Sequence, residues 1–333
     1  MGTLLDKPIT TKETSNVEHN GLTYGASSMQ GWRVEMEDQH TIEVHLTGLQ
    51  DHSLVAVYDG HGGQFAAKFA GKTLVAEFLS SESVAEYNRS GFRETSLLEK
   101  ALKETFVAVD EKLKTEADVQ CGDCSGCTAI CAVITPSHIV CASAGDSRGI
   151  MVTSGQVRAL SEDHKPDGAI ERERIESAGG CVSMRRVDGD LAVARALGDF
   201  QYKDRPDLPV DRQKVTCVPD VRTTPRSSGD EVLVLACDGI WDVMSNQDCC
   251  DCVRQIYQEG ETDSGLVCEE LLDTCLTKGS RDNMSVVMVQ FPAMLEPPPG
   301  TAAGAERGGG VMARRSKRAE EQRAREAAQD NQN

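Results

Sequence analysis

Three aspartates in the sequence follow directly on short apolar runs. Asp59 follows SLVAVY, Asp146 follows IVCASAG, and Asp238 follows LVLAC. Apolar runs of this length predict strands, so each carboxylate is expected where a strand ends. In an antiparallel hairpin the end of one strand lies beside the start of its neighbour. Acids that follow one strand and acids that precede its partner are therefore expected at the same end of a sheet.

Other acids precede two predicted strands. Glu37 and Asp38 stand before HTIEVHL, which a hairpin would pair with the strand that ends at Asp59. Asp282 stands before MSVVMVQF, and antiparallel pairing with EVLVLACD would bring it beside Asp238. Ionised carboxylates packed at this density repel one another and lose hydration, which costs several kcal/mol each.

A bound cation would remove this conflict. All-oxygen ligands without a His or Cys cluster favour Mg²⁺ or Mn²⁺ over Zn²⁺. Two such ions about 4 Å apart would bind and activate a water for attack on a phosphoryl group. The alternative for each acid taken alone is a strand end capped in solvent. The convergence of the whole set favours the metal site.

The rest of the pattern describes the scaffold. The predicted strands are joined by hairpin-length connections, so the sheets are expected to be largely antiparallel. Helical spacing of apolar residues marks residues 63–79 and 98–114, and GLVCEELLDTCL predicts a third helix. Strands clustered in hairpins with helices between the clusters predict an α+β fold, a layered αββα sandwich.

Composition limits the classes of function. The 333 residues carry 53 Asp and Glu against 35 Lys and Arg, a net charge of −18, so binding of nucleic acid through net charge is not expected. There is no apolar run long enough to span a membrane and no basic-then-apolar start, which predicts an intracellular protein, cytoplasmic and in addition nuclear if the basic tail acts as an import signal. Thirteen irregularly spaced Cys favour reduced thiols. We expect a monomer.

Changes in composition predict three parts. An N-terminal segment is expected over residues 1–19, a catalytic domain over 20–292, and a flexible basic and polar tail over 293–333. Within the domain, dense charge from about 163 to 220 predicts an excursion on its surface, which we call the flap.

Six motifs occur in order along the domain: GWRVEMEDQH, YDGHGG, AGDSRG, LAVARALGDF, CDGIWDV and GSRDNMSV. Together they resemble the metal-dependent protein phosphatase family, usually called protein phosphatase 2C. The resemblance implies a phosphatase of phosphoserine and phosphothreonine proteins with two central antiparallel sheets flanked by helices. Its nucleophile would be a metal-bridging water or hydroxide, without a covalent intermediate.

The resemblance also implies roles for the acids. Asp59 is expected to bridge both metals, Asp238 and Asp282 to complete the first, and the Gly60 carbonyl to bind the second. Glycine suits that position because a side chain would crowd a carbonyl turned toward an ion. Further expected ligands are Glu37 and Asp38 for the second metal, and Asp146 and Asp242 for a weaker third metal.

Three basic side chains are candidates for contact with substrate. The guanidinium of Arg33 could grip two phosphate oxygens, and the alternative is a surface ion pair. His61 is expected to donate a proton to the leaving Ser or Thr oxygen, although a lone His is more often structural. Arg186 is expected to contact phosphopeptide near the cleft, or to be a solvated flap residue. Trp241 is expected in core packing, and Asp199 as a structural acid rather than a ligand.

Three further features lie outside these motifs. Cys121, Cys124 and Cys127 have zinc-like spacing but no local fourth ligand; by the hairpin argument they lie near Asp146, where their oxidation would lower activity. Gly2 follows Met1, as N-myristoylation requires, but Asp6 replaces the usual Ser or Thr, and one acyl chain would give only reversible peripheral membrane contact. The segment ARRSKRAEEQRAR is an import signal, a partner helix or a solvated tail.

Two classes of function compete. The favoured one is an active Mn²⁺- or Mg²⁺-dependent hydrolase with phosphoproteins as its partners. The alternative is a pseudophosphatase, a scaffold that keeps the fold. Family members of that kind lack metal-site acids, whereas every matched acid is present here, which favours the enzyme. The sequence contains no C-x₅-R loop of tyrosine phosphatases beside the acids, so phosphotyrosine is not expected as the main substrate.

Overall fold

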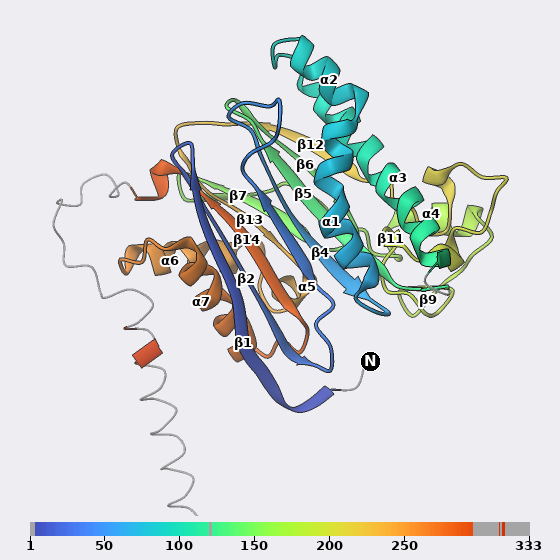
Figure 1. The fold of residues 1–333 in the computed structure, drawn as a ribbon. Coiled ribbons are helices and arrows are strands. Elements are labelled where there is room, and N and C mark those ends of the chain that lie inside the picture. The colour runs from blue at the N-terminus through green and yellow to red at the C-terminus, as the bar shows by residue number, and fades with distance from the viewer. Residues whose placement is uncertain (1–3, 120–121, 296–312, 314, 317–333) are drawn as a thin grey trace, which may run out of the picture.

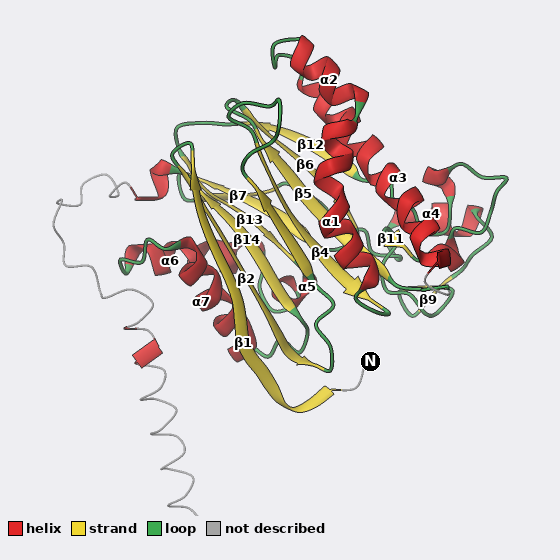
Figure 2. Cartoon of the chain, in the orientation of Figure 1, coloured by secondary structure: helices red, strands yellow, loops and turns green. Residues whose placement is uncertain are grey.

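Two antiparallel sheets packed face to face form the centre of the molecule. The computed structural model describes residues 4–119, 122–295, 313, 315 and 316. Figure 1 shows the two stacked sheets with helices on their outer faces, and Figure 2 shows the same view with helices, strands and loops in different colours. The layered α+β sandwich expected from the sequence is confirmed.

Each sheet has six hydrogen-bonded strands. The first sheet has the order β1 (Leu4–His19), β2 (Leu22–Arg33), β14 (Met284–Gln290), β13 (Asp230–Ala236), β7 (Arg148–Thr153) and β8 (Gln156–Ala159). The second has the order β12 (Asp220–Pro225), β6 (His138–Ala144), β5 (Gly126–Ile134), β4 (Ser53–His61) and β3 (Gln39–Glu43), with β11 (Leu197–Gly198) paired to β5.

Helices cover the outer face of each sheet. The second sheet is covered by α1 (Phe65–Ser80) and α3 (Thr95–Val119), against which α2 (Glu82–Arg89) packs, and the first by α5 (Asp238–Trp241), α6 (Asn246–Gln258) and α7 (Ser264–Thr277). A short 3₁₀ turn, η3 (Pro292–Leu295), follows β14.

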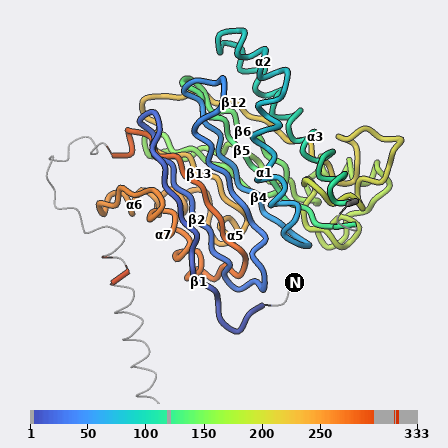
Figure 3. Tube along the Cα trace, viewed as in Figure 1, coloured from blue at the N-terminus to red at the C-terminus, as the bar shows by residue number. Residues whose placement is uncertain are grey.

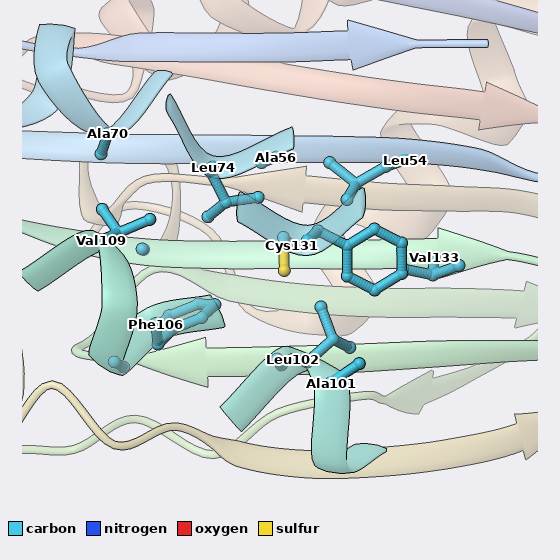
Figure 4. Packing of buried hydrophobic residues seen from close by; sticks show 14 of the residues in the cluster. Leu54, Ala56, Ala70, Leu74, Ala101, Leu102, Phe106, Val109, Cys131 and Val133 are labelled. Atoms are coloured by element: carbon cyan, nitrogen blue, oxygen red, sulfur yellow. The ribbon is translucent and has the colours of Figure 1, made fainter. Parts of the chain in front are cut away.

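Apolar side chains fill all three interfaces between these layers. Val55 and Val57 of β4 meet Leu235 of β13 between the sheets. The opposite face of β4 carries Leu54 and Ala56 into the helical interface. Figure 4 shows this interface, in which Leu74 of α1 and Leu102 and Phe106 of α3 lie over the strands. Because both faces of the central strands are buried, these strands are continuous apolar runs in the sequence.

The N-terminal segment belongs to the domain. Residues 4–19 form β1, which pairs with β2 from Leu4↔Arg33 to His19↔Leu22 with two register shifts. The boundary expected near residue 20 therefore does not separate this segment from the sheet. Its polar sequence fits an edge strand, because most of its side chains are exposed.

The flap forms a compact unit beside the sandwich. It contains α4 (Ala169–Ser177), β9 (Val182–Ser183), β10 (Arg186–Val187), η1 (Phe200–Tyr202) and η2 (Val210–Arg212). Figure 3 traces it as the yellow-green part of the tube beside α3. Its own small core contains Ile175, Val187, Val193, Ala194, Ala196, Tyr202 and Val215. One part of the flap, β11, joins the second sheet.

Candidate metal-dependent active site

The acids that follow and precede the strands meet at one cleft. Asp59 lies two residues before the end of β4, Asp238 begins α5 two residues after the end of β13, and Asp282 precedes β14 by two residues. The predicted antiparallel pairings are present, with Gln39 of β3 opposite Tyr58 of β4 and Ala236 of β13 opposite Val286 of β14. Asp59, Asp146, Asp238 and Asp282 all line a cavity of about 390 Å³.

Two overlapping groups of side chains are close enough to share a cation. One carboxylate oxygen from each of Asp59, Asp146 and Asp238 lies within 4.8 Å of the others. Oxygens of Asp38 and Asp59 and the Sγ of Cys237 form a second such group. Asp59 belongs to both groups, so it lies at the centre of the cluster. The presence of a thiol here was not predicted.

Burial makes this cluster electrostatically costly without a cation. Burial first, and then repulsion from Asp238 and other acids, raises the pKa of Asp59 well above its ordinary value. The pKa of Asp238 is raised for the same two reasons, with Asp146 as its strongest repelling neighbour. Burial raises the pKa of Asp38 to about 7. Each raised pKa means that the surroundings do not stabilise the charged carboxylate enough to offset its burial and the repulsion of neighbouring acids.

Unpartnered oxygens show that the residues fit a divalent ion. Both carboxylate oxygens of Asp38 and Oδ1 of Asp146 are buried without a hydrogen-bond partner. The other oxygen of Asp146 accepts a hydrogen bond from the ammonium group of Lys165. Buried oxygen acceptors without donors are the ligands that hard cations take.

Gly60 and Glu37 are in close contact at the edge of the cluster. A Cβ at position 60 would lie 2.3 Å from the carbonyl oxygen of Glu37, so only glycine fits. The Glu37 carboxylate accepts a hydrogen bond from the backbone N–H of Gly63 at 2.6 Å. The side chain of Asn283 accepts a hydrogen bond from the Glu37 N–H at 2.9 Å and donates to the carbonyl of Glu35 at 3.0 Å. Asn283, which the sequence analysis did not select, thus anchors the loop that carries Glu37.

Arg33 lies at the mouth of the cluster. Its guanidinium donates a hydrogen bond to Asp282 Oδ2 at 2.6 Å, and its side chain remains 39% exposed. Burial lowers the pKa of Arg33, but attraction to Asp282, Asp238 and Asp59 outweighs burial and raises it. The group therefore stays a cation that can face an anionic ligand in the cleft.

His61 is paired with Asp199. The two side chains are joined by a hydrogen bond of 2.7 Å between Nε2 and Oδ2. The pairing follows from strand order, because His61 and Gly198 both lie opposite Gly126 on β5. A Cβ at Gly126 would lie 2.2 Å from Asp199 Oδ2 and 2.6 Å from His61 Nε2, so a glycine is required where the pair crosses the strand. Burial lowers the pKa of His61, but Asp199 outweighs burial and raises it.

The remaining predicted site residues lie farther from the cluster. Asp242 is exposed at the end of α5 and belongs to neither group of potential ligands, although burial and nearby acids raise its pKa. Arg186, on the flap, lines the same cleft. Trp241 is 7% exposed and donates from Nε1 to the carbonyl of Ala236 at 2.8 Å, which agrees with its predicted role in packing.

The cysteine motif does not form a metal site among the described residues. Cys124 is exposed and lines the cleft, whereas Cys127 is buried on β5. Neither belongs to a group of potential metal ligands. Cys121, Gly2 and most of the basic tail lie outside the described residues. Within the described part of the chain, no helix is long and apolar enough to cross a membrane.

This fold and site define a class, that of two-sheet domains with a potential metal-binding carboxylate cluster at one end of the sandwich. Comparison with known proteins makes the class specific, because residues 22–284 match the family Protein phosphatase 2C. The chain belongs to this family, which identifies the matched domain as that of a metal-dependent serine/threonine protein phosphatase.

Several relatives are similar over most of this chain. Protein phosphatase ppm-1.A of Caenorhabditis elegans is 44% identical over 308 residues, which cover 89% of this chain and 65% of the relative. Protein phosphatase 1B of Rattus norvegicus is 45% identical over 296 residues, which cover 87% of this chain and 76% of the relative. A crystal structure of serine-threonine phosphatase 2C from Toxoplasma gondii superposes with a TM-score of 0.71 at 26% identity, covering 84% of this chain and 99% of that one.

Proposed function

We propose that this protein hydrolyses phosphoserine and phosphothreonine in phosphoproteins and depends on Mn²⁺ or Mg²⁺. The observation that carries the proposal is the carboxylate cluster at the cleft, in which the buried side chains of Asp38 and Asp146 together have three oxygens without a hydrogen-bond partner. The relatives named as protein phosphatases support the same activity. No observation favours the scaffold alternative, because each acid on which the metal site would depend is present.

The proposed ligands divide between two ions and a weaker third. Asp59 would bridge the first two ions, and its membership of both groups of potential ligands supports this role. Asp238 and Asp282 would complete the first site, while Glu37, Asp38 and the Gly60 carbonyl would serve the second. Asp146 and Asp242 would hold the third; Asp146 is the better supported of the two, because one of its oxygens is buried and unpartnered.

The side chains around the cluster suit phosphate-ester hydrolysis. Divalent ions, when bound, would activate water and neutralise phosphate charge. Arg33 would exchange its contact with Asp282 for two phosphate oxygens, which its planar fork matches. His61, held by Asp199, would donate its proton to the leaving Ser or Thr oxygen. Arg186 would contact the peptide from the flap.

Release of phosphate from a phosphothreonine peptide tests the activity. We expect turnover with millimolar Mn²⁺ or Mg²⁺ and its loss in EDTA, restored when the ion is added back. Parallel assays with a phosphotyrosine peptide should show little release. A folded protein that releases no phosphate from several phosphothreonine peptides with either ion would contradict the proposal and favour the scaffold.

Replacement of Asp199 by Asn is expected to impair proton donation to the leaving group. The variant keeps the shape of the side chain but removes the charge that sustains the proton on His61. We expect kcat for a phosphothreonine peptide to fall by about 10²-fold. For p-nitrophenyl phosphate, whose leaving group is stable without a proton, the fall should be much smaller.

Steady-state kinetics on both substrates checks this expectation. The control is Asp207→Asn, which alters an exposed flap carboxylate paired with Arg205 and should leave both rates unchanged. Equal losses on the two substrates in Asp199→Asn would show that the pair does not act through the leaving group.

We also propose that the protein acts inside the cell as a monomer. Thirteen irregularly spaced Cys in a chain of this length favour reduced thiols, and with them a reducing compartment. Acylation of Gly2 would add reversible membrane contact.

A further inference from the structure

The cleft has two unlike parts. The acids and Arg33 line one part of it, and the flap lines another part, which we call the flap wall, through Arg186, residues 190–193 and Tyr202. A phosphate held at the acids leaves the rest of a peptide to pass along the flap wall. The position of that wall therefore determines how well a peptide fits, whereas a small phosphate ester makes little use of it.

The flap wall is built from two tight turns in succession. Val182 pairs with Val187 in the β9–β10 hairpin, and Val187 then bridges to Leu191. Met184 and Arg185 in the first turn have φ values of 50° and 62°, in the left-handed region that non-glycine residues rarely adopt. Such turns persist only where surrounding contacts hold them.

Asp190 supplies a contact of this kind. Its carboxylate accepts a hydrogen bond from the hydroxyl of Tyr202 at 3.0 Å, and its carbonyl oxygen accepts one from the guanidinium of Arg186. One residue thus connects the flap arginine to a tyrosine outside the hairpin.

Tyr202 is a firm support for this contact. It is 6% exposed within the small core of the flap, and its backbone N–H donates to the carbonyl of Asp199 at 2.9 Å. Burial first, and then the bond to Asp190, raises the pKa of Tyr202, so the phenol stays protonated as a donor. Asp199, which binds His61, and Tyr202, which binds Asp190, are only three positions apart in one short 3₁₀ turn.

We propose that the hydrogen bond between Tyr202 and Asp190, which we call the strut, holds the β9–β10 hairpin in place beside the cleft. Tyr202 and Asp190 are then positioning residues for the peptide part of the substrate. The proposal rests on phosphopeptide hydrolysis and on the role of Arg186 given above. Loss of the strut lets the hairpin and Arg186 shift relative to the acids. Peptide binding weakens as a result, while the reacting groups at the acid cluster stay in place.

Variants that remove either half of the bond test the strut. Tyr202→Phe removes the donor, and Asp190→Ala removes the acceptor but keeps the carbonyl that Arg186 uses. In each we expect KM for a phosphothreonine peptide to rise about three- to tenfold, as loss of one hydrogen bond would give, with kcat within about twofold of wild type. The change in KM for p-nitrophenyl phosphate should be smaller.

Two further variants distinguish the effect of losing the hydrogen bond from the effect of losing a charge and from non-specific structural damage. Asp190→Asn removes the charge but keeps an acceptor oxygen, so its peptide KM should stay near that of wild type. The double variant Tyr202→Phe with Asp190→Ala should be no worse than either single variant, because all three lack the same bond. The matched control is Tyr257→Phe, which loses a 3.1 Å contact with Ser264 in the helical layer on the other sheet and should not change peptide KM.

Several results would overturn the strut. These are an unchanged peptide KM in folded Asp190→Ala, equal effects on peptide and p-nitrophenyl phosphate, or additive effects in the double variant. Arg186→Ala, assayed alongside, should raise peptide KM as well. If Arg186→Ala leaves peptide KM unchanged while Tyr202→Phe raises it, then Arg186 does not contact the peptide, and the strut affects binding through another part of the flap wall. Failure of the proposed activity is distinct, because wild-type protein would then release no phosphate from peptides.

Discussion

Asp238→Asn is expected to abolish metal-dependent turnover while making the metal-free protein more stable. Asp238 is half-buried at the cleft, and Asp146 and Asp282 repel its charge. Asparagine keeps the shape but removes one negative charge from the cluster. Without metal, this relieves repulsion and should raise Tm by a few degrees, since about 1 kcal/mol corresponds to about 2–4 °C in domains of this size range.

The same substitution removes a proposed metal ligand. We expect phosphopeptide turnover to fall by about 10³-fold or more, as loss of several kcal/mol of transition-state stabilisation implies. Mn²⁺ should raise the Tm of the wild type through binding to the folded state, and should raise that of the variant much less. A substitution that lowers activity but raises stability is expected where residues are kept for function, whereas both would fall if the cluster served only to stabilise the fold.

Calorimetry with and without EDTA, together with phosphate release, checks both effects. Asp251→Asn is the matched control, because it alters an exposed carboxylate on α6 and should change neither quantity. A variant that is less stable than the wild type in EDTA, or that keeps metal-dependent turnover, would show that Asp238 is not a ligand in a repulsive cluster.

Gly60→Ala is expected to damage the site through the backbone. The added Cβ would lie 2.3 Å from the carbonyl oxygen of Glu37 and 3.1 Å from its Cβ. Gly60 does not have a positive φ, so the obstacle is the contact and not its own backbone conformation. Glu37 cannot yield freely, because Gly63 holds its carboxylate and Asn283 holds its N–H. We expect a loss of about 1–3 kcal/mol in the free energy of unfolding and at least a 10²-fold loss of turnover.

Urea unfolding and Mn²⁺ titration by calorimetry measure the two parts of this prediction. Gly71→Ala is the control, since a Cβ there would meet its nearest neighbour at 3.6 Å, an ordinary contact. It lies within α1, where alanine should stabilise the protein by up to about 1 kcal/mol. A Gly60→Ala protein that binds Mn²⁺ as the wild type does would show that Glu37 and the Gly60 carbonyl are not needed for the ions.

The central strands and the main acids could be predicted because their signals are local. A strand buried on both faces, such as β5, is a continuous apolar run, and the hairpin rule places the acids at its neighbours' ends. The edge strand β1 lacks that signal, because its polar side chains are mostly exposed and it is placed by pairing with β2 and by side-chain contacts with α7. The helix α6 was also missed, although its buried residues Cys249, Cys250, Val253, Ile256 and Tyr257 have helical spacing and Ser245 caps its start.

The sequence by itself determined the kind of chemistry, because carboxylates at the ends of apolar strands carry the metal-site pattern in their residue types and spacing. Only the tertiary structure decided how that chemistry is held in place. Asp199 reaches His61 across 138 positions because β11 pairs with β5. Gly126 has no side chain that would fill the space between them. Asn283 reaches Glu37 across 246 positions for a similar reason. Contacts of this kind depend on sheet order and on the space beside a glycine, neither of which a local pattern records.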